Sequence, residues 1–210
     1  NQAAKTFKPQ GEIHRLFETE PGEVKAPRKE STLPVSVPKC LFGCKESSQP
    51  LRGREMMKRE LAMKVVLDIL VSPSSAIYQK LYDEQLISDS FGSEYNIAEQ
   101  YAFSVIGGDT KDPELLINRV KEEIDKVKAS GIDRADFERS KKKKIGAFLR
   151  QLNSPEAIAN EFTKYRFKDM DLFDILPVYE QLSLEDVNAC LADHFNWNQL
   201  AASIVRSEAK

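Results

Sequence analysis

Apolar residues recur along this chain with two different periods, one typical of helices and one typical of strands. Residues 54–71 place apolar side chains at every third or fourth position, which predicts a largely buried helix. Residues 87–97 instead alternate apolar and polar side chains, and so do residues 101–105 after a short return. Such alternation predicts strands with one buried face. The short return favours an antiparallel pair.

Capping residues mark the ends of the predicted helices. The Ser-Pro pair at 72–73 ends the first helix, because a residue before proline is pushed out of helical geometry. Ser74 or Ser75 can cap the helix that follows. The Asp-Pro pair at 112–113 gives the next helix an N-cap and a proline at its first position, and Gly131 closes it. Further helices are expected over residues 133–153, 154–168, 172–182 and 183–195.

The beginning of the chain differs in composition from the rest. Residues 1–7 are interpreted as the tail of a helix. Residues 8–31 combine charges, prolines and glycines with few apolar side chains, which is typical of a linker. Residues 33–46 predict two strand pieces joined by a bulge at Pro38, because the alternation changes phase there.

The predicted organisation is a helix tail and charged linker over 1–31, followed by one domain over 32–210. A last strand is expected over 200–205. Strands and helices are segregated along the chain, which favours an α+β fold over an alternating one. We expect an antiparallel sheet of about four or more strands covered by helices.

Composition and charge exclude several classes of partner. The formal net charge is -2, from 31 basic and 33 acidic side chains, so no net field favours nucleic acid or an anionic membrane. No apolar run approaches the roughly 18 to 20 residues that cross a bilayer. The first residues lack the apolar core of a signal peptide, which makes a cytoplasmic location the expectation. The three cysteines, Cys40, Cys44 and Cys190, are interpreted as small apolar core residues.

Several short motifs together carry a family resemblance. Residues 74–81, SSAIYQKL, are followed by SFGSEY and YAFSVIGGDT in the strand region, by the helices at 112–168, and by LSLEDV at 182–187. This order resembles the insulinase/pitrilysin family of zinc metallopeptidases over residues 32–206. Each motif is weak alone, and their order gives the resemblance its specificity.

The resemblance implies one half of a clamshell. Members are built from homologous α+β half-units that close on each other, and only one half carries the zinc motif. The charged linker before the domain is similar to the entry into the second, non-zinc half, in particular the C-terminal half of bacterial processing-protease-like members. On this resemblance the fragment itself is expected to be inactive, zinc is expected in the missing half, and the parent protein is expected to be a zinc metalloendopeptidase.

The histidines agree with that placement. The family's inverted H-x-x-E-H motif needs two histidines on one helical turn with a glutamate between them. The chain has only His14 and His194, and neither has a partner at that spacing. The position of a zinc helix is taken by residues 54–66, which contain no histidine. We therefore assign no catalytic, cofactor-binding or metal-binding residue to this chain.

Other candidate chemistry has structural explanations. Ser74 and Ser75 lack the glycine elbow of a nucleophile, and Gly107-Gly108 lacks the following lysine of a phosphate loop. The lysine run 141–144 has no interleaved aromatic residues and is interpreted as a solvated helix face. Paired carboxylates such as Glu122-Glu123 fit helix surfaces.

Three functions stay open from the sequence. The first is a wall of a peptidase chamber whose partners are the N-terminal half, or a homologous subunit, and a peptide substrate. The second is a non-enzymatic scaffold or accessory subunit of the same family. It is suggested because Ala102 and Leu115 stand about where members supply an arginine and a tyrosine for substrate. The third is a peptide-binding module with an exposed strand edge. An isolated half should also expose apolar surface and self-associate.

Overall fold

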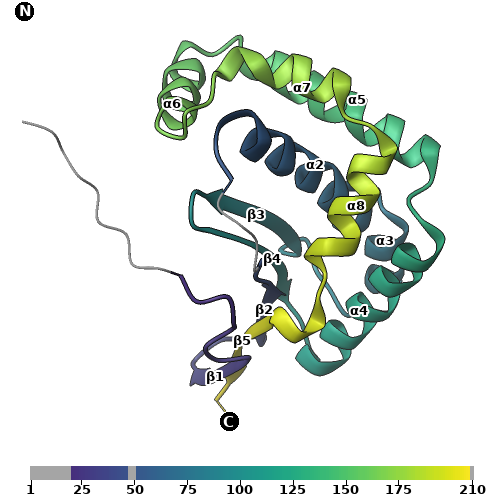
Figure 1. Cartoon of the computed structure of the whole chain (residues 1–210). Coiled ribbons are helices and arrows are strands. Elements are labelled where there is room, and N and C mark those ends of the chain that lie inside the picture. The colour runs from purple at the N-terminus through teal and green to yellow at the C-terminus, as the bar shows by residue number, and fades with distance from the viewer. Residues whose placement is uncertain (1–19, 47–50, 209–210) are drawn as a thin grey trace, which may run out of the picture.

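The computed structural model describes residues 20–46 and 51–208, and Figure 1 shows a sheet with helices gathered on one side. The sheet has five strands in the order β1-β5-β2-β4-β3. The strands are β1 (Arg28–Leu33), β2 (Lys39–Cys44), β3 (Gly92–Ala98), β4 (Tyr101–Asp109) and β5 (Leu200–Ser207). The helices are α2 (Gly53–Val71), α3 (Ala76–Asp83), α4 (Pro113–Ser130), α5 (Arg134–Gln151), α6 (Pro155–Arg166), α7 (Ile175–Gln181) and α8 (Leu184–His194), with short 3₁₀ turns η1 (Leu172–Asp174) and η2 (Trp197–Gln199).

The α+β prediction is confirmed, and the central pairings are antiparallel as expected. Strand β2 lies between β4 and β5, and β3 pairs with β4 through a tight return. Strand β1 differs from the prediction, because it pairs parallel with β5. The sheet is therefore mixed at one edge.

Strand β1 begins at Arg28, inside the segment that the sequence assigned to a linker ending at residue 31. All six of its residues are exposed, so it has no apolar alternation that could reveal it. Its backbone ladder with β5 and surface ion pairs hold it in place. Arg28 and Arg206 both pair with Glu30 and with Glu114 at the start of α4. The helix tail predicted over residues 1–7 lies outside the described residues.

Two predicted strands are shorter in the structure. Residues 34–38 connect β1 to β2 instead of forming a strand piece with a bulge, because β5 inserts between the two strands. Strand β3 starts at Gly92, so Ile87 and Phe91 are buried in the preceding loop and not in the ladder. In both places alternating apolar side chains, partly buried at Val35 and Val37 and buried at Ile87 and Phe91, suggested strand where the backbone makes a turn.

One face of the sheet supports the core. The side chains of Cys40, Phe42 and Cys44 point to the helices and are buried, as the alternation predicted. All three cysteines are free and buried, which confirms their interpretation as core residues. Burial raises the pKa of the Cys40 thiol to about 11 and that of Cys44 to about 12, so both stay protonated and unreactive.

Helix α2 runs through the centre of the fold between the sheet and the outer helices (Figure 1). The segment 53–83 is long and apolar enough to cross a membrane by length and composition alone, yet 61% of its apolar stretch is buried inside the domain. Such burial is typical of a core helix, so the segment is weak evidence for a membrane span.

The predicted caps are confirmed. The Ser75 side chain accepts a hydrogen bond from the Tyr78 amide and donates one to the Leu70 carbonyl, so it joins the start of α3 to the end of α2. Asp112 caps α4, whose C-cap residue is Gly131. These contacts fix the turn from α2 into the segment that leads to β3.

Candidate functional site

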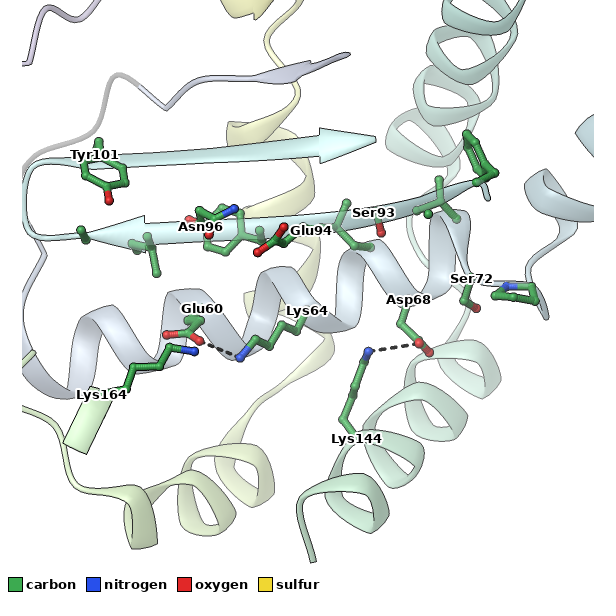
Figure 2. Close-up of a pocket in the computed structure, with 18 of the residues that line it drawn as sticks. Glu60, Lys64, Asp68, Ser72, Ser93, Glu94, Asn96, Tyr101, Lys144 and Lys164 are labelled. Carbon is green, nitrogen blue, oxygen red and sulfur yellow. Dashed lines mark hydrogen bonds and ion pairs between the residues drawn. The ribbon is translucent and has the colours of Figure 1, made fainter. Parts of the chain in front are cut away.

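A groove of about 570 Å³ lies between α2 and the free edge of β3. Its remaining wall comes from α5, from α6 and from Lys168, which follows α6. Figure 2 shows the polar side chains of α2 pointing into this space beneath the β3–β4 hairpin. Glu60, Lys64 and Asp68 are spaced by four residues, so they lie on one side of α2. Lys144 and Lys164 enter from the neighbouring helices (Figure 2).

Glu60 is the most buried charge of the groove, with 3% of its surface exposed. Its Oε1 atom lies 2.6 Å from Lys64 Nζ and accepts a hydrogen bond of 3.3 Å from the Tyr165 hydroxyl. Its Oε2 atom makes no hydrogen bond and lies 3.9 Å from Lys168 Nζ. Burial alone would raise the pKa of Glu60, but the charges of Lys64 and Lys168 outweigh it and hold that pKa below its usual range. The carboxylate is therefore ionised.

Asp68 closes the other end of the polar side of α2. It accepts hydrogen bonds from Ser140 and Lys143, both at 2.9 Å, and Lys144 lies 3.1 Å away. These three residues belong to α5. Burial opposes ionisation, but the lysines lower the pKa of Asp68 below its ordinary value. The lysine run is thus only partly the solvated face that the sequence suggested, because it ties α5 to α2.

The outer edge of β3 forms the upper wall of the groove. This strand has a neighbour on one side only, so alternate backbone groups face the groove. The carbonyl of Ile97 is one of them, and it accepts a 2.8 Å hydrogen bond from Lys168 Nζ. Burial lowers the pKa of Lys168, and Glu60 opposes that shift. Lys168 therefore occupies a position that the N–H of an added strand would use.

The groove does not fit a zinc ion. The two carboxylates that α2 contributes, Glu60 and Asp68, are eight residues apart, about 12 Å along the helix axis, which is too far for one metal to bridge, and the third carboxylate of the lining is that of Glu94 on β3. Glu60 and Asp68 are already neutralised by lysines, and no histidine is among the residues that line the groove. In the part of the chain that the structure describes, no group of three or more histidine, cysteine or acidic side chains could hold a metal ion.

A second polar cluster is buried in the core. His194 Nδ1 lies 2.7 Å from Glu46 Oε1, and its Nε2 lies 2.7 Å from the Ser104 hydroxyl. Glu46 also accepts a hydrogen bond from the Tyr95 hydroxyl at 2.9 Å and pairs with Arg59 at 3.0 Å. The cluster therefore joins α2 and α8 to the sheet.

The contacts from serine to histidine to glutamate in this cluster resemble those of a hydrolase triad, but the burial of the cluster gives it a structural role. His194 is 1% exposed and Ser104 3%, so no substrate reaches the serine oxygen. Desolvation would raise the pKa of Glu46, whereas the hydrogen bond from His194 and the charge of Arg59 lower it to about 2. The buried carboxylate thus remains charged and holds its partners.

Other residues that the sequence analysis singled out do not lie among the polar side chains of the groove. His14 lies outside the described residues. Ala102 is buried in β4, and Leu115 is an exposed residue of the first turn of α4, so neither lines the groove. The sequence did not identify Glu60, Asp68 or Lys168, although the four-residue spacing on α2 is a visible signal for the first two.

Comparison with known proteins agrees with this geometry. The family model described as the peptidase M16 inactive domain matches residues 5–144. The chain belongs to this family. An uncharacterised zinc protease of Bacillus subtilis, YmfH, is 38% identical over 201 residues, which is 95% of this chain and 46% of that protein.

Solved structures give the same placement. A crystal structure of an M16-like peptidase from Alicyclobacillus acidocaldarius is 30% identical with a TM-score of 0.91, covering 99% of this chain and 49% of that one. The peptidase M16 inactive domain from Pseudomonas fluorescens has the same fold at 15% identity, with a TM-score of 0.73 over 96% of this chain and 48% of the other. The chain therefore spans about half the length of these relatives and is an inactive C-terminal M16 domain.

Proposed function

We propose that this M16 domain forms one wall of the substrate chamber of a bacterial zinc peptidase, whose N-terminal half supplies the zinc ion and the general base. The observation that carries the proposal is the polar side of α2. There Glu60 pairs with Lys64 and Asp68 pairs with Lys144, so neither carboxylate is suited to bind a metal. The membership in the inactive-domain family and the half-length match to a zinc protease support it.

The wall would present the groove beside β3 to an extended peptide. A strand edge with outward-facing amides and carbonyls can bind a peptide backbone through main-chain hydrogen bonds, independent of its sequence. The lining of the groove by residues 91–98 of the β3 region supports this part of the proposal. The proposal also includes a processing type of activity on unfolded peptides. It places the protein in the reducing cytoplasm, which the three free cysteines support.

The test compares the full-length protein with this chain alone. Metal analysis of both should find one zinc per full-length molecule and none bound to the 210-residue chain. An unfolded fluorogenic peptide should be cleaved by the full-length protein in a chelator-sensitive reaction and left intact by the chain alone. Absence of both zinc and cleavage in the full-length protein would instead favour a non-enzymatic scaffold. Stoichiometric zinc in the chain alone would refute the assignment of the metal to the other half.

A further inference from the structure

One side chain, that of Lys168, closes the outer edge of β3. The Ile97 carbonyl is turned toward the groove, where it accepts the 2.8 Å hydrogen bond from Lys168 Nζ. Backbone groups of an antiparallel strand alternate between its two sides, so those of Ser93 and Tyr95 face the groove as well. A strand that is added along the whole edge needs the Ile97 carbonyl as an acceptor. Lys168 must therefore leave that carbonyl before such a strand can pair with it.

The same ammonium has a second acceptor nearby that lacks a donor. Glu60 Oε2 lies 3.9 Å from Lys168 Nζ, and within the described part of the chain it accepts no hydrogen bond. Lys64 and Tyr165 both bind the other oxygen, Oε1, and Figure 2 shows the contact with Lys64. Glu60 is only 3% exposed, and a buried carboxylate oxygen without a donor is destabilising. A movement of about 1 Å would bring Lys168 Nζ within hydrogen-bonding distance of Oε2.

The opposite edge of the sheet has no such arrangement. Lysines and other charged side chains commonly protect edge strands from unwanted pairing. Strand β1 is protected in this way along its length, since its sequence is RKESTL and Arg28 pairs with Glu30. At β3 the protecting ammonium instead stands between a neutral carbonyl and an unsatisfied carboxylate oxygen. Its hydrogen bond to the carbonyl is the weaker of the two that it could make, because charge-assisted hydrogen bonds are stronger than those to neutral groups.

An added backbone would satisfy both acceptors at once. Its amide N–H would take the place of the ammonium at the Ile97 carbonyl. Lys168 would then be released toward Glu60 Oε2, which gains the donor that it lacks. The loss of one hydrogen bond by Lys168 is thus offset by the formation of a stronger one, and the edge opens without leaving a buried charge unpaired.

We propose that Lys168 is a displaceable latch on the groove and that Glu60 is the positioning residue that receives it. This inference rests on the proposed function, in which an extended peptide lies along β3. The ligand that releases the latch is an extended backbone with an amide N–H opposite Ile97. The groove therefore selects for backbone and rejects proline at that position, because proline has no N–H to donate.

The effect of Glu60 on peptide affinity, measured with and without Lys168, tests the latch in a double-mutant cycle. The probe is a blocked, uncharged peptide of alternating valine and threonine with the seven-residue length of β3. Calorimetry measures its binding to the full-length protein with a chelator present, so that the peptide is not cleaved. Glu60→Gln, Lys168→Met and the double variant form the cycle. Glu55→Gln is the matched control, because Glu55 is exposed in the first turn of the same helix.

We expect Glu60→Gln to weaken peptide binding about fivefold when Lys168 is present, which corresponds to about one net hydrogen bond. In the Lys168→Met background the same substitution should change affinity by less than about twofold. Glu55→Gln should leave affinity unchanged. Equal effects of Glu60→Gln in the two backgrounds would overturn the proposal, and so would the absence of any effect. The same peptide with every amide N-methylated should not bind, and binding that survives would also overturn it.

A second substitution of Lys168 keeps the test decisive if Glu60→Gln does not fold by circular dichroism. The guanidinium of Lys168→Arg can donate to the Ile97 carbonyl and to Glu60 Oε2 at the same time, so it should hold the edge closed and weaken peptide binding. Lys168→Met should strengthen binding, and changes in the same direction would contradict the latch. Zinc-dependent cleavage is assayed separately without chelator. Its absence would refute the proposed peptidase function and leave these affinities unchanged, so the two failures are distinguishable.

Discussion

The buried Glu46 carboxylate should make the stability of this domain depend on pH in a way that one substitution removes. Its pKa is about 2 in the folded domain, against an ordinary value of 4.5. Because the folded pKa is lowered, its contribution is fully present above pH 4.5 and is lost as the pH falls toward 2. A difference of 2.5 pKa units corresponds to about 3 kcal/mol of unfolding free energy. At pH 3 roughly 2 kcal/mol of that should already be gone.

The matched variant is Glu46→Gln, which keeps the shape of the side chain but removes the charge. At pH 7 it leaves the guanidinium of Arg59 without its buried anionic partner, and we expect a loss of about 3 to 5 kcal/mol. Other carboxylates with lowered pKa values, such as Glu60, respond over the same pH range in both proteins. The informative quantity is therefore the difference between wild type and variant at each pH.

Urea unfolding at pH 7, 4 and 3 measures this difference. The single tryptophan, Trp197, packs against Phe195 next to the cluster and reports the transition by fluorescence, while circular dichroism gives an independent probe. We expect the gap between wild type and Glu46→Gln to narrow by about 2 kcal/mol between pH 7 and pH 3. The reasoning is wrong if the variant is within 1 kcal/mol of wild type at pH 7, or if the gap does not change with pH.

Three further predictions concern the backbone, a cap and the groove. Gly43→Ala would place a methyl group against a backbone carbonyl of β4 and should cost about 3 kcal/mol or more, whereas Gly92→Ala meets no atom within 4 Å and should cost under about 1 kcal/mol, as urea unfolding will show. Ser75→Ala removes two buried hydrogen bonds and should lower stability by about 2 kcal/mol; an unchanged melting temperature would contradict this. Lys168→Met frees the Ile97 carbonyl at the edge of β3. Calorimetry should therefore show that extended peptides bind this variant severalfold more tightly than they bind the control variant Lys142→Met. Equal affinities of the two variants would argue against peptide binding at this edge.

Local signals predicted most of the helical layer. Residues such as Ser75, Asp112 and Gly131 act on their own helix ends, so their effects can be read without the rest of the fold. The α+β class followed from the segregation of strands and helices along the chain, and the antiparallel centre of the sheet followed from two alternating stretches joined by a short return. The family resemblance supplied what the residues alone did not, because it identified the chain as the inactive half of an M16 peptidase.

Contacts between distant segments limited the rest. Strand β1 has no buried side chain, and its partner β5 is at the opposite end of the chain, so nothing in its own sequence marks it as a strand. The groove has the same limitation, since Asp68 is recognisable as a helical residue but its lysine partners come from α5. His194 and Glu46 are separated by 148 residues, and only the tertiary fold shows that they form one cluster.

The parallel pair of β1 and β5 also has a mechanical consequence. The chain enters this domain at the start of β1 and continues beyond the end of β5, and the two strands lie side by side at one edge (Figure 1). Because they run in the same direction, tension applied between the entry and the exit pulls them past each other along their length. The whole ladder then bears the load at once instead of opening one bond at a time, with the ion pairs of Arg28 and Arg206 adding to it. A force applied to the two ends of the domain would therefore be carried by this edge while the groove and the core keep their shape.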